Sequence, residues 1–245
     1  MPTTVTERAR RERPAPLGRA MPLHWTPLDR ERAGVVLECT RRVLADSNRT
    51  LDIVAVEEIT AQAQLAYLVD RGVFDTGEGR ALLADRPHLA DTDLSAMRAL
   101  PDGTLGREWS RFLDAHRLDP SLTKQPTPYT DDPVRAYLMH RIRQAHDLWH
   151  VLLDLGTRGH EEVLVHSFSL AQTGLPSSVA IVVLGALKHM VLERRWSVLR
   201  RDVLRAHRRG VRAAPLLAVY WERHLERRLD EVRAELNVRP MSHPG

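Results

Sequence analysis

Helical periodicity runs through most of the chain and restricts it to one class of fold. Apolar residues recur at three- and four-residue intervals among Arg and Glu in residues 29–45, 52–68 and 133–155, as in helices with one buried face. Alternating patterns that would indicate β-strands are absent at useful length. Because 245 residues fit one large domain, we predict an all-α fold with a single helical domain.

Proline and glycine mark where these helices begin and end. Pro133 stands near the expected start of the longest helix, and Gly156 and Gly159 follow its end. Residues 119–133 are rich in proline and are predicted to form a loop. Further helices are expected at 77–87, after the turn at 101–106, at 160–173, across 177–209 and at 215–237.

The first 22 residues differ from the rest of the chain. They are basic, contain several prolines and lack the apolar run of a signal peptide, so we expect a flexible tail at 1–22 and a folded domain at 23–240. An organelle-targeting peptide is the alternative for this segment, although Glu7 and Glu12 count against it. The longest apolar run, Val179 to Leu187, is far shorter than the roughly 20 residues of a membrane span. The expected location is cytoplasmic, with peripheral contact at the inner face of a membrane left open.

Basic side chains are numerous but nearly balanced by acids. The net charge is only +4, too small to indicate nucleic acid binding by itself. Residues 193–212 form the one dense basic segment, which we interpret as a solvated face, with contact to anionic lipid headgroups as the alternative. Its arginines are Arg194, Arg195, Arg200, Arg201, Arg205, Arg208, Arg209 and Arg212.

The segment HDLWH, inside the expected helix at 133–155, is the strongest chemical signal. His146 and His150 are four residues apart, so both imidazoles leave the same face of the helix and suit one metal ion. Asp147 is close enough to bind the ion or to orient a histidine. A second carboxylate, from Glu161 or Glu162, would return on the next helix. We therefore predict a divalent-metal site.

Two other interpretations of this segment stay open at this stage. In a chain with 12 histidines, a His-Asp-x-x-His match can arise by chance on a solvated helix. The His-Asp pair also occurs in metal phosphohydrolases, which need further ligands. His116 is a candidate, but no spacing selects it.

The residues around this motif resemble a known family. The stretch DDPVRAYLMHRIRQAHDLWHVLLDLGTRGHEE from Asp131 is similar to the metal-binding core of the coenzyme Q biosynthesis protein four family. That family places a glutamate twelve residues after the second histidine, which selects Glu162 rather than Glu161, and a Gln-Thr-Gly-Leu-Pro element, here at 172–176, follows. Similar segments at 79–87, 100–120 and 214–238 extend the resemblance over residues 30–238.

The resemblance implies a helical protein of ubiquinone biosynthesis. Family members are linked to metal-dependent, oxidative removal of the ring carboxyl of a polyprenylated 4-hydroxybenzoate, and we expect such a decarboxylase here. One alternative is a non-catalytic scaffold that binds isoprenoid lipid and other biosynthetic enzymes. Another is a diverged tailoring enzyme for a different aromatic natural product. A homodimer is also left open, and nucleic acid is not expected as a partner.

The resemblance also assigns roles to individual residues. The expected metal ligands are His146, Asp147, His150 and Glu162, and Zn²⁺ suits them best, although iron, cobalt or manganese would fit. Asp147 and Glu162 are the expected catalytic residues, because a carboxylate not committed to the metal can move a proton.

Three further features concern substrate binding, and the first two depend on the same comparison. Arg141 and Arg143 match the family pattern and are expected to bind an anionic substrate group, with solvated helix charges as the alternative. Ser169 stands where the family often has an acid, which predicts different chemistry or a different substrate. Residues 175–192 are apolar on all sides and predict a core helix, or else the wall of a prenyl tunnel or a dimer seam.

Overall fold

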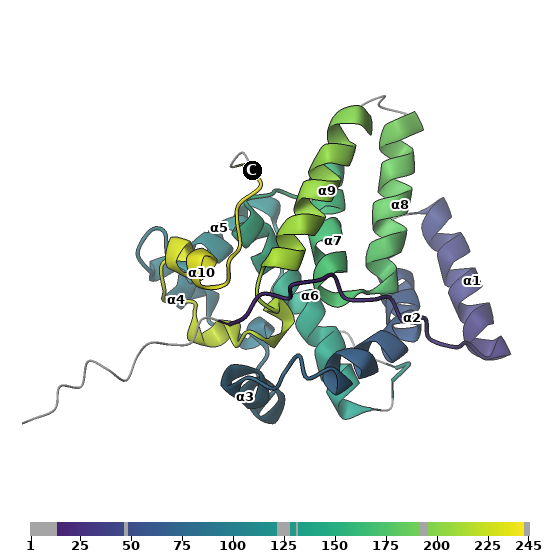
Figure 1. Cartoon of the computed structure of the whole chain (residues 1–245), viewed down its shortest axis with the longest axis horizontal. Coiled ribbons are helices and arrows are strands. Elements are labelled where there is room, and N and C mark those ends of the chain that lie inside the picture. Colours follow the sequence, from purple (N-terminus) through teal and green to yellow (C-terminus); the bar gives the residue numbers. More distant parts are fainter. Residues whose placement is uncertain (1–13, 47–48, 122–127, 131, 192–195, 243–245) are drawn as a thin grey trace, which may run out of the picture.

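The computed structural model describes residues 14–46, 49–121, 128–130, 132–191 and 196–242. These ranges form one helical domain without a β-strand (Figure 1), apart from a single isolated bridge between Thr104 and Arg228. The predicted all-α fold is therefore confirmed. The helices are α1 (Arg30–Ala45), α2 (Thr50–Asp70), α3 (Gly77–Asp85), α4 (Leu94–Ala99), α5 (Leu105–His116), α6 (Pro133–Leu153), α7 (Gly159–Thr173), α8 (Pro176–Val191), α9 (Trp196–Arg212) and α10 (Leu229–Glu235).

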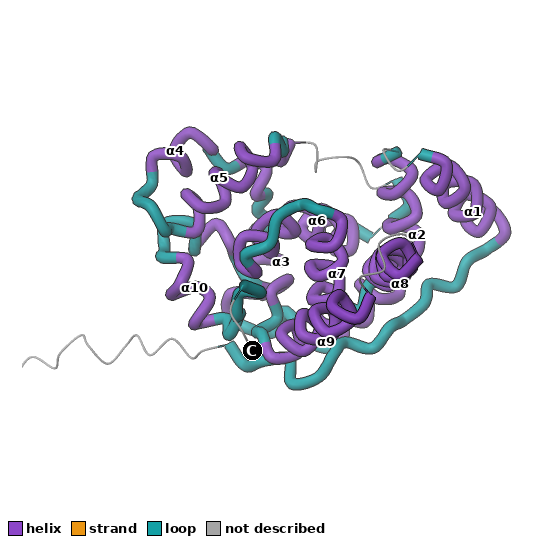
Figure 2. Tube along the Cα trace, turned by 90° about the horizontal axis from the view of Figure 1, so that it is seen from above, coloured by secondary structure: helices purple, strands orange, loops and turns teal. Residues whose placement is uncertain are grey.

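Helices α6 and α7 occupy the middle of the molecule in both views (Figures 1 and 2). Large aromatic side chains fill the core around them: Trp109 of α5 and Trp149 of α6 are fully buried. Trp149 meets Phe168 of α7 edge to face, with ring centroids 6.3 Å apart, a geometry that aromatic pairs favour. This packing holds the two helices that carry the predicted site in a fixed relation.

The chain that precedes α1 packs against the helices. Leu17 donates a backbone hydrogen bond to the carbonyl of Ala213, just after α9, Gly18 donates to that of Val211 in the last turn of α9, and Met21 donates to Ala171 of α7. Figure 1 shows this dark purple segment crossing the helices towards α1. Residues 14–22 thus do not form the flexible tail expected for them, because their backbone groups find partners on the body of the protein. Residues 1–13 lie outside the described residues.

The single helix expected at 215–237 is wrong. Two 3₁₀ turns, Leu216–Ala218 and Trp221–Arg223, precede the short α10. Distant partners use the carbonyls that a continuous helix would need, since Gly106 donates to the Leu225 carbonyl and Leu105 to that of Arg227. A side chain at Gly106 would come within 3.0 Å of the Leu225 carbonyl, so its absence permits this close approach.

Helix α8 leaves part of its apolar surface uncovered. Val183, Leu184 and Leu187 are each about half exposed, so the prediction that residues 175–192 form a core helix is wrong for this face. In α9, Arg200, Arg201, Arg208 and Arg212 are exposed, whereas Arg209 is buried and donates to the Arg239 carbonyl. Arg194 and Arg195 lie outside the described residues.

Charged side chains tie α1 to α2. Asp52 of α2 accepts a hydrogen bond of 2.8 Å from Arg42 of α1 and another from Arg49. The Arg49 hydrogen bond is the main cause that lowers the pKa of Asp52, to about 2, against the opposing effect of burial. Because the folded pKa lies below the unfolded value of about 3.9, this stabilisation is complete above that value and is lost as the pH falls through the folded pKa.

We predict that Asp52→Asn makes the stability of the protein less dependent on acid pH. The free energy of unfolding, measured by urea denaturation at pH 4, 3 and 2, should fall less steeply for the variant than for the wild type, because the variant has no carboxylate to protonate. Parallel curves for the two proteins would contradict the assignment.

Candidate metal centre

The connection between α6 and α7 determines where the predicted ligands lie. Pro133 occupies the first turn of α6, and Asp132 caps it by accepting from the backbone of Val134 and Arg135. The helix ends at Leu153, and Asp154, which follows it, has a left-handed backbone (φ 56°). Residues 154–158 then lead into α7, and Glu162 lies in its first turn. The imidazoles of one helix thereby meet a carboxylate of the next.

Three of the predicted ligands converge on one point. The Nε2 atoms of His146 and His150 are 3.0 Å apart, and Glu162 Oε2 lies 3.4 Å from the first and 3.5 Å from the second. Ligand atoms bound to zinc at about 2.1 Å in a tetrahedron are roughly 3.4 Å apart, so this spacing fits a small divalent cation. Within the described part of the chain, this is the one such group of three or more side chains.

His150 is held in the orientation that a ligand needs. Its Nδ1 donates a hydrogen bond of 3.0 Å to the Gly156 carbonyl, and since a carbonyl only accepts, Nε2 keeps its lone pair for a metal. Phe112 of α5 stacks on the ring with centroids 5.3 Å apart. His150 is 1% exposed, whereas His146 and Glu162 are about one third exposed, so the open side of the group is that of His146 and Glu162.

The electrostatics of the group couple its members. Burial opposes the charged form of His146, but the carboxylates of Glu162 and Asp147 outweigh it and raise its pKa. Burial disfavours the Glu162 carboxylate, yet the two imidazoles hold its pKa well below the usual range. Burial, followed by the charge of His146, lowers the pKa of His166 to about 3. Glu162 is therefore an anion in the folded protein, and His166 is neutral.

Asp147, a predicted ligand, lies outside the group of converging donors. Successive side chains on a helix are rotated by about 100°, so the residue next to His146 leaves a different face from the two histidines. Burial is the main cause that raises the pKa of Asp147, and the nearby His146 and His150 oppose it. Asp147 is thus a neighbour of the centre.

Arg141 does not face the centre. It is fully buried, donates to both Glu222 carboxylate oxygens at 2.6 and 2.9 Å, and reaches the Val219 carbonyl at 3.0 Å. This contradicts the expectation that Arg141 binds a substrate anion, because the guanidinium already neutralises an acid inside the fold. The pair instead attaches the irregular C-terminal segment to α6.

Arg143 lies on the same helix as the two histidines, and its predicted role in substrate binding stays a prediction. It precedes His146 by three residues and so shares its face of α6. Its guanidinium pairs with Glu58 at 2.8 Å and with Glu57 at 3.4 Å, both from α2. Its Nη1 is buried and has no hydrogen-bond partner among the described residues. Arg143 therefore retains a donor that could meet an anion.

Sequence reasoning missed several neighbours of the centre. His166 follows Glu162 by four residues, and its ring centroid is 5.1 Å from that of His146; the spacing of a histidine and a carboxylate at i and i+4 was the available signal. No local pattern marks Phe112 or the α2 glutamates. Ser169 donates to the Val165 carbonyl within its own helix. Where other family members often have an acidic side chain, this chain therefore has a buried hydroxyl group.

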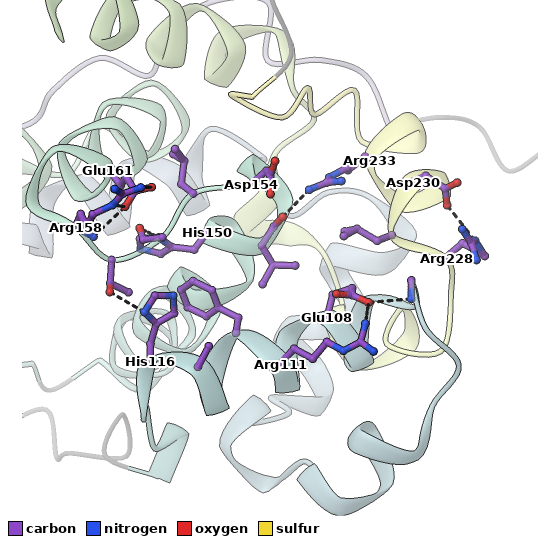
Figure 3. Close-up of a pocket in the computed structure, with 18 residues that line it drawn as sticks. Glu108, Arg111, His116, His150, Asp154, Arg158, Glu161, Arg228, Asp230 and Arg233 are labelled. Atoms are coloured by element: carbon purple, nitrogen blue, oxygen red, sulfur yellow. Dashed lines mark hydrogen bonds and ion pairs between the residues drawn. The ribbon is translucent and has the colours of Figure 1, made fainter.

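A cleft of about 940 Å³ lies behind His150, between α5, α10 and the loop 154–158. Figure 3 shows the charged side chains around it, with His150 among the residues that line it. Arg111 pairs with Glu108, Arg158 with Glu161 and Arg228 with Asp230. Arg233 donates to the carbonyls of Val151 and Leu152 at the end of α6. The cleft is therefore lined by balanced charges.

The fold and the site together define a class of all-helical protein in which two central helices form a candidate metal centre. The family model for "Coenzyme Q (ubiquinone) biosynthesis protein Coq4" matches residues 22–242. The chain belongs to this family of ubiquinone biosynthesis proteins, as its motifs predict.

Individual relatives agree with this assignment. The chain is 44% identical over 191 residues to a ubiquinone biosynthesis protein COQ4 homolog of Danio rerio, covering 76% of this chain and 69% of the relative. It is 36% identical over 191 residues to the human homolog, covering 76% and 71%. A crystal structure from Nostoc punctiforme, also described as a ubiquinone biosynthesis protein, shares the fold with a TM-score of 0.67 and 24% identity, over 86% of this chain and 99% of that one.

The curated relatives in these two comparisons are named as mitochondrial. Among the described helices of this chain, none combines the length and apolar character required to cross a bilayer. The cytoplasmic or membrane-peripheral location expected from the sequence stays a prediction.

We predict that Zn²⁺ stabilises the protein through Glu162. At a free ion concentration one hundred times Kd, a single site adds about 2.7 kcal/mol to the free energy of unfolding, and Glu162→Gln should remove most of this gain. Thermal unfolding with and without Zn²⁺ measures it, with Glu231→Gln, at an exposed carboxylate of α10, as the matched control. Equal stabilisation of both variants would exclude Glu162 as a ligand.

Arg141→Met should destabilise the fold by about 3 kcal/mol, because it leaves the Glu222 carboxylate without its partner inside the protein. Arg98→Ala removes a pair with Asp114 that is exposed on both sides and should cost less than about 1 kcal/mol. Urea denaturation compares the two variants. Similar small losses for both would show that the Arg141 pair contributes no more than a surface pair.

Proposed function

We propose that this protein is a metal-dependent decarboxylase of ubiquinone biosynthesis that removes the ring carboxyl of a polyprenylated 4-hydroxybenzoate. The observation that carries the proposal is the convergence of His146, His150 and Glu162 in a chain of the Coq4 family. When bound there, a divalent cation supplies a Lewis acid that accepts negative charge from the substrate. Two imidazoles and a carboxylate suit Zn²⁺ best, and iron, cobalt or manganese also fit.

The residues around the centre support this chemistry. Arg143 is assigned to hold the substrate carboxylate, because its buried Nη1 has no partner among the described side chains and guanidinium groups bind carboxylates well. The bond to the carboxyl carbon breaks with its electron pair left on the ring, carbon dioxide leaves, and the ring carbon takes a proton. Asp147, beside the ligands and not among them, is assigned to deliver that proton, with Glu162 as the alternative carrier.

An apolar groove supports a polyprenyl tail on the substrate. The groove holds about 370 Å³ and runs between α2, α8 and the N-terminal segment, past Trp25, Val183 and Leu184. Ser177, which also lines it, donates to Glu57, and Glu57 contacts Arg143. A bound tail would therefore lie next to the polar residues that neighbour the centre.

The same groove favours a second candidate function, that of a non-catalytic scaffold which binds isoprenoid lipid. The exposed apolar side chains of α8 would then contact lipid, a membrane surface, a second copy or other biosynthetic enzymes. Both functions use the groove, but only the first needs turnover at His146, His150 and Glu162.

We predict that the metal-loaded protein releases labelled carbon dioxide from a carboxyl-labelled 3-polyprenyl-4-hydroxybenzoate. Glu162→Gln should reduce the rate at least a hundredfold, whereas Glu231→Gln should keep it. Arg143→Gln should raise KM about tenfold through the loss of a charged hydrogen bond worth about 1.4 kcal/mol. Parallel assays with Zn²⁺, Fe²⁺, Co²⁺ and Mn²⁺ identify the active metal, and the product mass tells whether hydrogen or hydroxyl replaces the carboxyl.

Absence of carbon dioxide release with all four metals would overturn the decarboxylase proposal. If such a protein still binds polyprenylated ligands in the α8 groove, the scaffold function is favoured. Release from a hydroxybenzoate without a prenyl chain, in preference to the prenylated one, would favour a tailoring enzyme for another aromatic compound.

A further inference from the structure

The orientation of His150 depends on one backbone carbonyl. His150 Nδ1 donates to Gly156 at 3.0 Å, which leaves Nε2 as the lone-pair side facing His146 and Glu162. Gly156 lies in the loop 154–158, outside the regular hydrogen bonding of α6 and α7. The loop that carries Gly156 sets the orientation of the His150 ring. The contacts that hold Gly156 in place therefore influence how well His150 can bind a metal ion.

Glu161 is the side chain that holds this loop. It is 9% exposed and accepts from the Arg158 backbone at 3.1 Å and from Arg158 Nε at 2.9 Å. Burial raises its pKa, but the Arg158 side chain and the backbone N–H groups of Gly156 and Arg158 lower it overall. A Cβ atom at Gly156 would lie 3.0 Å from Glu161 Oε2. The carboxylate is therefore packed directly against the residue that orients His150.

A second contact anchors the same loop from outside. Thr157 Oγ1 and His116 Nδ1, at the end of α5, are 2.9 Å apart, and Figure 3 shows this contact together with the Arg158–Glu161 pair. The contact of Thr157 is exposed and joins the loop 154–158 to α5 at the surface, whereas the Glu161 carboxylate is buried against the loop. Glu161 is thus the better candidate for control of the Gly156 carbonyl.

We propose that Glu161 is a positioning residue for the metal centre: it holds Gly156 so that the Gly156 carbonyl fixes the tautomer and ring direction of His150. This inference rests on the metal centre of the proposed function and not on the decarboxylation step. It assigns different roles to two adjacent glutamates. Glu162 binds the ion, and Glu161 orients the histidine that binds it.

Glu161 also caps the first turn of α7, and a cap alone would stabilise the helix without any effect on metal affinity. Co²⁺ titration, followed by visible absorption, separates the two roles. Glu161→Ala should weaken Co²⁺ binding by ten- to a hundredfold, the usual range for partners that orient a ligand. Glu161→Gln keeps one acceptor oxygen and should recover most of the affinity.

Asp93→Ala is the matched control. Asp93 caps α4 by accepting from the backbone of Ser95 and Ala96, and it is not among the residues of the centre or its loop. This variant should lose stability through the cap and bind Co²⁺ as the wild type does. If Glu161→Ala also binds Co²⁺ within twofold of the wild type while its Tm falls, Glu161 is only a cap and the proposal is overturned.

A double-mutant cycle tests the contact itself. Gly156→Ala adds a Cβ against the Glu161 carboxylate and should weaken Co²⁺ binding about tenfold in the wild type. In the Glu161→Ala background the added Cβ meets no carboxylate, so the same change should have little further effect. If the Co²⁺ affinity of the double variant falls by the product of the two single losses, the two residues act independently, and the result contradicts the proposal.

Histidine ¹⁵N chemical shifts of the metal-free protein give a readout that needs neither metal nor substrate. His150 should carry its proton on Nδ1 in the wild type and in Asp93→Ala, and should populate both tautomers in Glu161→Ala. An unchanged tautomer in Glu161→Ala would overturn the proposal. A wild type that binds Co²⁺ but releases no carbon dioxide would overturn the decarboxylase and leave this inference standing.

Discussion

The hydrogen bond from His150 to the Gly156 carbonyl is the constraint on which the candidate centre depends. It joins the last turns of α6 to the loop that starts α7, so one contact sets the tautomer of a ligand and the path of the chain towards Glu162. Because the ring is almost fully buried beneath Phe112, it has little freedom to choose another partner. The centre is therefore pre-organised on its buried side and accessible on the side of His146 and Glu162.

Two arginines on α6 have different surroundings because they lie on different faces of the helix. Arg141 and Arg143 are two residues apart and leave the helix about 200° from one another. Arg141 neutralises Glu222 inside the fold and anchors the irregular C-terminal segment. Arg143, on the face of His146, is balanced by acids of α2 and keeps one buried donor without a partner among the described residues. The buried Nε of Arg141 also lacks a hydrogen-bond partner among the described residues, so the two arginines differ in the acids they pair with and in the face of α6 that they occupy.

Polar and apolar surfaces meet next to the centre in a way that fits an amphipathic substrate. Glu57 links Arg143 to Ser177 at the start of α8, and the apolar groove along α8 begins at the neighbouring Pro176. A molecule with an anionic ring and a long hydrocarbon tail would satisfy both surfaces. This arrangement is an observation of the structure and does not depend on the family assignment, and it is the reason for proposing a substrate with both an anionic and an apolar part.

The sequence by itself determined the helical class, most helix boundaries and the pairing of His146 with His150 on one helix face, because helical periodicity and a four-residue spacing are local properties of the chain, whereas the choice of Glu162 over Glu161 came from the resemblance to the family. Local patterns could not decide that Asp147 stays outside the group, that Arg141 is buried against Glu222, or that residues 215–237 leave the helix. Each outcome depends on partners far away in the chain. Only the tertiary structure brings those partners together. The reason is that these hydrogen bonds and buried contacts form between different helices and loops, and not within one of them.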